Sequence, residues 1–230
     1  MTGDPASGER SANSGRQREF PPQIVAVEGL DGTGKSTVAD AIVALTDGVN
    51  ITKVAAEQMG SSSRDTVCMS DSAEARFHYW SYMNYLVGDL AKDTVASGRV
   101  AVIDSYFFRT IVTHYVLGVR TRMGPFFEKA VRPDRAVLLT VPEPIRASRL
   151  RARKVTGILP EWHRRIDDRW RQVLALYRIF RLMEVDSTVS PYGVALTTLH
   201  STDAERFRFD DSSTGCLDVP VDLVADMRCQ

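Results

Sequence analysis

The stretch Glu28-Gly29-Leu30-Asp31-Gly32-Thr33-Gly34-Lys35-Ser36-Thr37 decides the fold of this chain. From Gly29 to Ser36 it fits the pattern G-x-x-x-x-G-K-[ST], whose glycines let the backbone turn until successive N–H groups point at phosphate oxygens. An apolar, β-branched run precedes it at residues 24–27, and apolar side chains follow at helical spacing over residues 38–45. Because strand, glycine-rich loop and helix is the context that the motif requires, we predict a phosphate-binding loop.

This loop predicts an ATP site that works with magnesium. Lys35 would reach the β- and γ-phosphates, the Ser36 hydroxyl would ligate Mg²⁺, and the start of the following helix would add partial positive charge. Asp104 ends a buried run at residues 100–104, and an acid at the carboxyl edge of a parallel sheet lies beside the loop. We therefore predict Ser36 and Asp104 as metal ligands; the alternative for Asp104 is a strand-end residue that caps the next segment.

The rest of the chain alternates between strand and helix patterns. The predicted strands cover residues 24–27, 49–55, 100–104 and 136–141, with weaker candidates at 194–199 and 206–209. The predicted helices cover residues 72–96, 111–116, 162–180 and 219–227, and the polar, serine-rich segment 61–71 predicts a mobile loop. This order predicts an α/β fold, with a parallel sheet that helices cover on both faces.

Length and composition restrict the classes of partner. The chain of 230 residues suits a single domain over residues 23–230, after a disordered leader at 1–22 that has no periodicity. Since 29 basic residues balance 29 acidic ones, no global field favours nucleic acid or a membrane surface. The scattered cysteines, and the lack of a signal peptide or a spanning apolar run, predict a cytoplasmic protein. The phosphate-binding loop predicts a small-molecule partner, a nucleoside or nucleotide.

Several residues are candidates for binding the phosphoryl acceptor. Asp31, inside the loop, and Glu57, after the predicted second strand, could each bind a sugar hydroxyl, and Glu57 could also act as a general base. Trp80 and Asn84 lie on the aromatic helix at 72–96 and could line a pocket for a flat base. The alternatives are a surface turn for Glu57 and ordinary core packing for the aromatic residues.

Arginines gather in the segment after the fourth strand. Arg146, Arg149 and Arg153 share one helix face through their spacings of three and four residues. A lid at about residues 146–160 would use them to neutralise charge in the transition state. The alternative is a solvated basic face.

Taken in order, these motifs resemble those of the thymidylate kinase family of P-loop nucleotide kinases. Residues 28–37 are similar to that family's E-G-x-D-G-x-G-K-S-T loop, and Asp104-Ser105-Tyr106 is similar to its D-R-Y motif. The later matches are Pro133-Asp134, Val141-Pro142-Glu143 with Arg149, and Arg169-Trp170-Arg171 through Tyr177. The resemblance covers residues 24–180 and implies a five-stranded parallel sheet, an Arg-rich lid and a homodimer. It also implies that Asp31 binds the acceptor's 3′-hydroxyl and that Arg149 lies by ATP.

The departures from that family all lie on the acceptor side. Ser105 occupies the position of the arginine in the family's D-R-Y motif. Around Glu57 the chain has A-E-Q-M-G where the family has R-E-P-G-G. The family's base-stacking arginine would fall near Asn84. The resemblance therefore points to phosphoryl transfer in which the acceptor need not be dTMP.

Three functions compete. The first is a nucleoside monophosphate kinase in which Arg109, or else Arg64 or Arg76, replaces the missing arginine. The second is a nucleoside kinase with Glu57 as general base. The third is a nucleotide-binding switch, but Thr52-Lys53 is followed by Val54 and so lacks the guanine motif N/T-K-x-D.

The predicted roles are as follows. The catalytic residues are Lys35, Asp31, Glu57, Arg149 and Arg153. The ATP-binding residues are Gly29, Asp31, Gly32, Thr33, Gly34, Lys35, Ser36, Thr37 and Arg149. The acceptor-binding residues are Asp31, Glu57, Trp80, Asn84, Tyr106 and Arg109. The expected cofactors are ATP and Mg²⁺.

Overall fold

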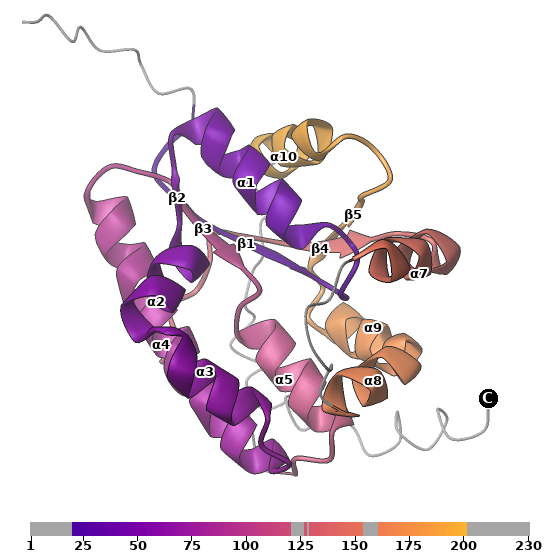
Figure 1. Cartoon of the computed structure of the whole chain (residues 1–230). Coiled ribbons are helices and arrows are strands. Elements are labelled where there is room, and N and C mark those ends of the chain that lie inside the picture. Colours follow the sequence, from indigo (N-terminus) through magenta and orange to yellow (C-terminus); the bar gives the residue numbers. More distant parts are fainter. Residues whose placement is uncertain (1–19, 121–126, 128, 154–160, 202–230) are drawn as a thin grey trace, which may run out of the picture.

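A five-stranded parallel sheet forms the centre of the molecule (Figure 1). This computed structural model describes residues 20–120, 127, 129–153 and 161–201. The strands stand in the order β2-β3-β1-β4-β5. They are β1 (Ile24–Gly29), β2 (Val49–Asn50), β3 (Ala101–Asp104), β4 (Arg135–Thr140) and β5 (Met183–Asp186). The sequence prediction of an α/β fold with five parallel strands is confirmed.

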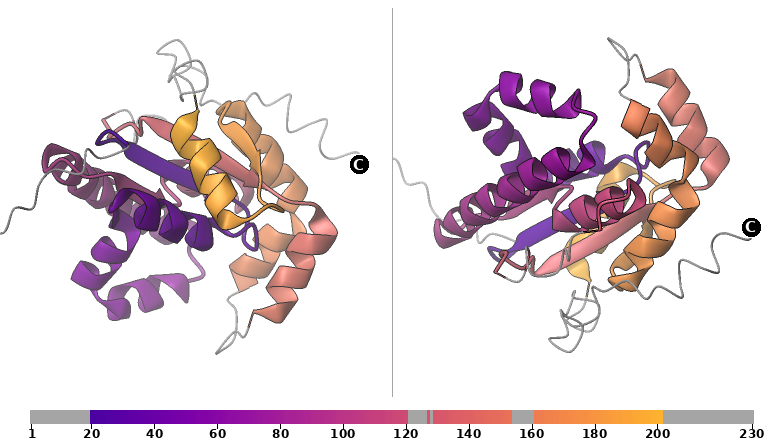
Figure 2. Two further views of the ribbon diagram at one scale, coloured as in Figure 1. Left: turned by 90° about the horizontal axis from the view of Figure 1, so that it is seen from above. Right: turned by 90° about the horizontal axis from the view of Figure 1, so that it is seen from below.

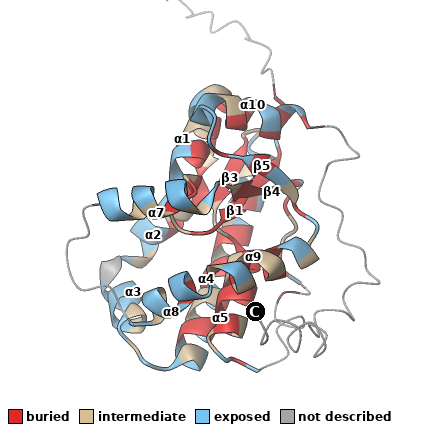
Figure 3. Cartoon of the chain, turned by 90° about the vertical axis from the view of Figure 1, so that its right-hand side faces the viewer, coloured by how far each residue is buried: buried red, intermediate tan, exposed pale blue. Residues whose placement is uncertain are grey.

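Helices cover both faces of the sheet (Figure 2). They are α1 (Lys35–Thr46), α2 (Ile51–Met59), α3 (Ser61–Cys68), α4 (Ala73–Ala96), α5 (Phe107–Val116), α7 (Glu143–Ala152), α8 (Glu161–Asp168), α9 (Trp170–Ile179) and α10 (Pro191–His200). Alternate residues of β1 point to opposite faces, because side chains in a strand have a period of two. Ile24 and Ala26 join the core under α4, α5 and α9, whereas Val25 and Val27 join the core under α1 and α10. Both faces of the central strands are therefore buried (Figure 3).

The second predicted strand is wrong over most of its length. Only Val49–Asn50 pairs with β3, and residues 51–59 form α2. The Asn50 side chain accepts a hydrogen bond from the Lys53 N–H at 3.1 Å, which is the geometry of an N-cap and starts a helix there. The predicted mobile loop at 61–71 is also wrong, because residues 61–68 form α3.

Two predictions in the C-terminal half also need correction. The single helix predicted at 162–180 is two helices, α8 and α9, with a break at Arg169. The strand predicted at 194–199 lies inside α10, because the Ser190 hydroxyl caps its N-terminus and Pro191 occupies its first turn. The elements predicted at 206–209 and 219–227 lie outside the described residues, as does part 154–160 of the predicted lid.

The fold begins a little earlier than the sequence pattern predicts. Phe20, assigned above to the leader, is buried and packs against His200 with ring centroids 5.1 Å apart. Within the part of the chain that the structure describes, no helix is both long and apolar enough to cross a membrane.

Candidate active site

The loop between β1 and α1 has the backbone of a phosphate-binding loop. Gly34, the residue before α1, has φ of +93°, which side-chain-bearing residues rarely adopt. At Gly29 a Cβ atom would lie 2.8 Å from both the Leu139 carbonyl oxygen and the Thr33 hydroxyl, so the loop can pass β4 only with glycine there. The loop therefore wraps closely around the start of α1, where unpaired N–H groups can receive an anion.

A cavity of about 710 Å³ opens from this loop toward α4 and α5. Its lining includes most residues to which the sequence assigned a role: Asp31, Gly32, Gly34, Lys35, Ser36, Thr37, Trp80, Asn84, Asp104, Tyr106, Arg109, Arg149 and Arg153. Gly29 and Thr33 lie behind this surface and shape the loop. Glu57 does not line the cavity.

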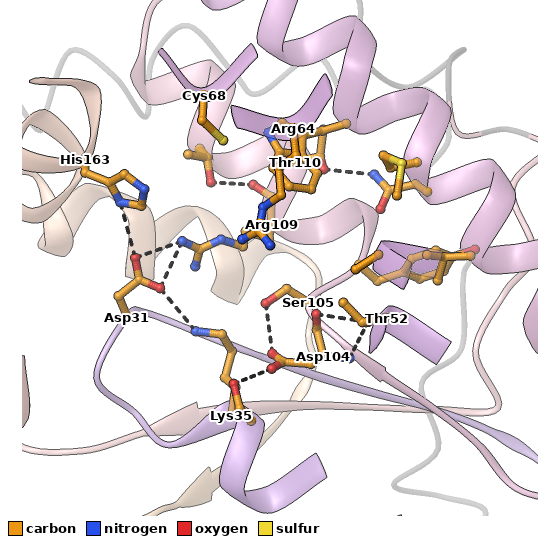
Figure 4. Close-up of a pocket in the computed structure, with 18 of the residues that line it drawn as sticks. Asp31, Lys35, Thr52, Arg64, Cys68, Asp104, Ser105, Arg109, Thr110 and His163 are labelled. Atoms are coloured by element: carbon orange, nitrogen blue, oxygen red, sulfur yellow. Dashed lines mark hydrogen bonds and ion pairs between the residues drawn. The ribbon is translucent and has the colours of Figure 1, made fainter. Parts of the chain in front are cut away.

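Three basic side chains converge on Asp31 (Figure 4). Arg109 of α5 donates two hydrogen bonds to its carboxylate at 3.0 and 3.1 Å, and Lys35 lies 3.6 Å away. His163 of α8 places Nδ1 3.7 Å from the same carboxylate. The Arg109 guanidinium in particular holds the pKa of Asp31 far below its usual range, so Asp31 stays ionised.

Two oxygen ligands suited to magnesium lie side by side at the loop. The Ser36 hydroxyl donates a hydrogen bond of 2.5 Å to the Asp104 carboxylate. Thr52 holds Asp104 in place, because its hydroxyl accepts from the Asp104 N–H at 3.0 Å. Mg²⁺ prefers oxygen ligands and usually takes only one or two from the protein, with water and phosphate oxygens completing the shell. The pair therefore fits the ion.

The three clustered arginines, Arg146, Arg149 and Arg153, have different surroundings. Arg146 is buried, where it pairs with Glu143 at 2.6 Å and with Asp167 of α8 at 2.7 Å, so it joins α7 to α8. Arg149 donates to the Thr33 carbonyl at 3.4 Å and to the Ser187 carbonyl at 3.0 Å, beside the loop. Arg153, just after α7, lines the cavity. The prediction that all three share one role is wrong for Arg146.

Glu57 and Tyr106, both predicted to bind the phosphoryl acceptor, do not lie as the sequence predicted. Glu57 lies on the exposed side of α2 instead of at a strand end, so the sequence misplaced it. Tyr106 lines the cavity, but its hydroxyl donates to the Val131 carbonyl at 3.0 Å and is held in the core.

Sequence reasoning missed two histidines of the cavity. His114 on α5 and His163 on α8 both line it, although neither belongs to a metal-binding spacing. The only available signal for His114 was its place one turn after Thr110, whose carbonyl its Nδ1 contacts at 2.7 Å. For His163 the sequence held no signal, because its partner Asp31 is more than a hundred residues away.

A buried carboxyl group lies directly behind the loop. Glu28 is fully buried and accepts hydrogen bonds from the Tyr106 N–H at 2.7 Å and the Tyr177 hydroxyl at 3.0 Å. Burial raises its pKa from 4.5 to about 7. Glu28 therefore connects β1, α5 and α9 at the point where the loop begins.

Glu28→Gln is expected to remove a pH-dependent loss of stability. Because the folded-state pKa is raised, this group favours folding most below pH 4.5, and its contribution is lost as the pH rises to 7. The free energy of unfolding of Glu28→Gln, relative to wild type, should rise by about 3 kcal/mol between these limits. Urea unfolding followed at several pH values measures this difference; a difference that does not change with pH would contradict the assignment.

Comparison with known proteins identifies the family of the chain. The AAA domain family matches residues 25–159, which is more than half of the chain. The thymidylate kinase of Xylella fastidiosa (strain M12) is 28% identical over 137 residues, covering 55% of this chain and 62% of that protein. The thymidylate kinase of Xanthomonas campestris pv. campestris (strain B100) is 25% identical over 138 residues, covering 56% and 61%. The chain thus spans about three fifths of the length of these curated relatives.

A solved structure of thymidylate kinase from Candida albicans superposes with a TM-score of 0.53 at 15% identity, covering 77% of this chain and 89% of that one. At this identity the likeness concerns the fold alone. From the family match, the sequence relatives and the shared fold, we conclude that the chain belongs to the AAA domain family and is a thymidylate kinase-like protein with the P-loop kinase fold.

Proposed function

We propose that this protein transfers the γ-phosphoryl group of ATP to the phosphate of a nucleoside monophosphate. The observation that carries the proposal is the charge of the single cavity that joins the loop to α4 and α5. Besides Lys35, its lining holds four guanidinium groups, those of Arg64, Arg109, Arg149 and Arg153. Its two carboxylates are Asp31, already ion-paired, and Asp104, already bonded to Ser36. A cavity of this charge suits two phosphorylated molecules.

The proposed roles follow from position. The loop amides and Lys35 bind the triphosphate, and Arg149, held beside Thr33, lies where it can neutralise charge on the transferred group. Ser36 and Asp104 would hold Mg²⁺, which would neutralise charge on the phosphate groups. Arg109 pairs with Asp31 and orients the acceptor's phosphate. It thereby takes the role of the family's arginine, at whose position this chain has Ser105. Phosphoryl transfer depends mostly on such positioning and electrostatic stabilisation.

Among the described residues, the base that the sequence suggested for a nucleoside kinase does not line the cavity. A neutral hydroxyl acceptor gains from a carboxylate that removes its proton. Glu57, the candidate from the sequence, is outside the cavity lining, and Asp31 has a pKa far below that of an effective base. The monophosphate acceptor, which is already ionised near neutral pH, needs no such group.

A substrate panel separates the two. Purified protein with ATP and magnesium is offered nucleosides and nucleoside monophosphates, and ADP release is followed with product identification by chromatography. We expect diphosphate formation from at least one monophosphate and no turnover of nucleosides. Turnover confined to nucleosides would reject the proposal, and Glu57→Gln would then show whether that residue is the base.

A further inference from the structure

Three residues with polar side chains, Asn84, Thr110 and His114, line the far wall of the cavity where α4 packs against α5. Asn84 of α4 donates from Nδ2 to the Thr110 hydroxyl at 2.8 Å. His114 of α5 places Nδ1 2.7 Å from the Thr110 carbonyl oxygen. Both side chains therefore contact Thr110, Asn84 through its hydroxyl and His114 through its carbonyl oxygen. Asn84 and His114 line the cavity although only 6% and 4% of their surfaces are exposed.

The proton of His114 has a defined position. A carbonyl oxygen can only accept, so Nδ1 must carry the hydrogen, and Nε2 of the neutral ring keeps a lone pair. Burial lowers the pKa of His114 to about 4, so the ring is neutral throughout the physiological range. The ring also packs against Phe77 with centroids 5.7 Å apart, which holds it in place.

Two hydrogen-bond acceptor atoms at this wall, one on His114 and one on Asn84, have no donor in the part of the chain that the structure describes. Among the described residues nothing donates to Nε2 of His114, nor to Oδ1 of Asn84 in the arrangement given above. Neither atom is among the fully buried side-chain atoms of the described residues that lack a partner, so both are open to the cavity, where a ligand with matching donors can pair with them. Trp80, one helical turn before Asn84, lines the same part of the cavity and offers a flat face for a ring.

We infer that this pair of acceptors selects an acceptor nucleotide whose base carries an exocyclic amino group, as cytosine and adenine do. The inference rests on the proposed function for the presence of a nucleotide here. One amino hydrogen is donated to Oδ1 of Asn84 and the other to Nε2 of His114. Thymine and uracil present carbonyl oxygens on both sides of their single ring N–H, so a carbonyl lone pair would oppose a buried acceptor. A site that hydrogen-bonds a group of its substrate rejects analogues without that group far more strongly than an apolar pocket does.

Binding and turnover can be measured separately, so this inference and the proposed function can fail independently. Equilibrium binding of CMP, dCMP, AMP, UMP and dTMP is measured by calorimetry in the absence of ATP. We expect the amino-bearing nucleotides to bind at least about 50-fold more tightly than dTMP and UMP, because the single ring N–H of thymine or uracil can pair with only one acceptor and a carbonyl oxygen then faces the other. Equal or tighter binding of dTMP or UMP overturns the inference. Absence of phosphorylation for every nucleotide overturns the proposed function instead.

Two variants test the named atoms. His114→Phe keeps a buried ring but removes the lone pair, and Asn84→Leu removes the other acceptor. Each should lower the ratio of CMP to dTMP affinity at least about tenfold. His78→Phe is the matched control, because His78 is exposed on α4 and does not line the cavity; its ratio should equal that of wild type. Thermal unfolding identifies which variants fold, and an unchanged ratio in a folded His114→Phe or Asn84→Leu overturns the inference.

Discussion

Lys35→Met is expected to lower kcat for phosphoryl transfer by at least about 10²–10³-fold. Lys35 is the first residue of α1, and its ammonium group donates to the Leu30 carbonyl at 2.9 Å while facing Asp31. It is buried, and desolvation lowers its pKa. A charge in this position stabilises the phosphate oxygens as the bond to the leaving group breaks, and methionine keeps the length of the side chain without that charge.

The control for this variant is Lys53→Met. Lys53 is an exposed lysine of α2 that pairs with Asp40 at 2.7 Å, away from the cavity lining. Initial rates with saturating ATP, together with thermal unfolding of each variant, compare the two. If Lys35→Met retained rates close to those of wild type, the loop would not be the site of the triphosphate.

Arg109→Met is expected to lower kcat/KM for the monophosphate acceptor by about 10³-fold, an effect of the size found for transition-state arginines. The guanidinium group donates to Asp31 and to the Gly29 carbonyl at 3.2 Å, so it connects α5 to the phosphate-binding loop. Its removal also leaves the Asp31 carboxylate with Lys35 and His163 as its remaining partners. The variant therefore loses both the proposed contact with the acceptor and a contact that orders the loop.

The double variant Asp31→Asn/Arg109→Met separates these two effects. Neutral asparagine needs no counter-ion, so unfolding measurements should find part of the lost stability regained. Activity should stay low if Arg109 contacts the acceptor's phosphate. Recovery of activity in the double variant would mean that Arg109 acts only through Asp31. Arg178→Met serves as control, since Arg178 forms an exposed pair with Glu184 at 2.8 Å.

Local patterns predicted those parts of the site that lie within one short segment. The loop at residues 28–37 could be identified because a phosphate-binding turn needs glycine at fixed positions within a few residues. Asp104 could be placed beside it, since strand ends of a parallel sheet meet at one edge, and Val27 is indeed paired with Asp104. The long helix α4 was predicted because its pattern persists through 24 residues.

Other residues could not be placed from their neighbours in the sequence. Glu57 was misplaced because the cap at Asn50 ended the strand after two residues, which turned the following segment into a helix. Arg146 and Arg149 share a helix, but Arg146 also pairs with Asp167 of α8, a contact that spacing within α7 could not predict.

The sequence by itself therefore determined the fold class, the phosphate-binding loop and the position of Asp104 beside it, because backbone conformation and strand order follow from short-range spacing and periodicity. Only the tertiary structure decided which charged side chains line the cavity, that Asn84 and His114 both contact Thr110, and that His163 faces Asp31. These contacts join segments that lie far apart in the chain. They depend on how helices pack across the sheet, and residue spacing within one segment carries no information about that packing.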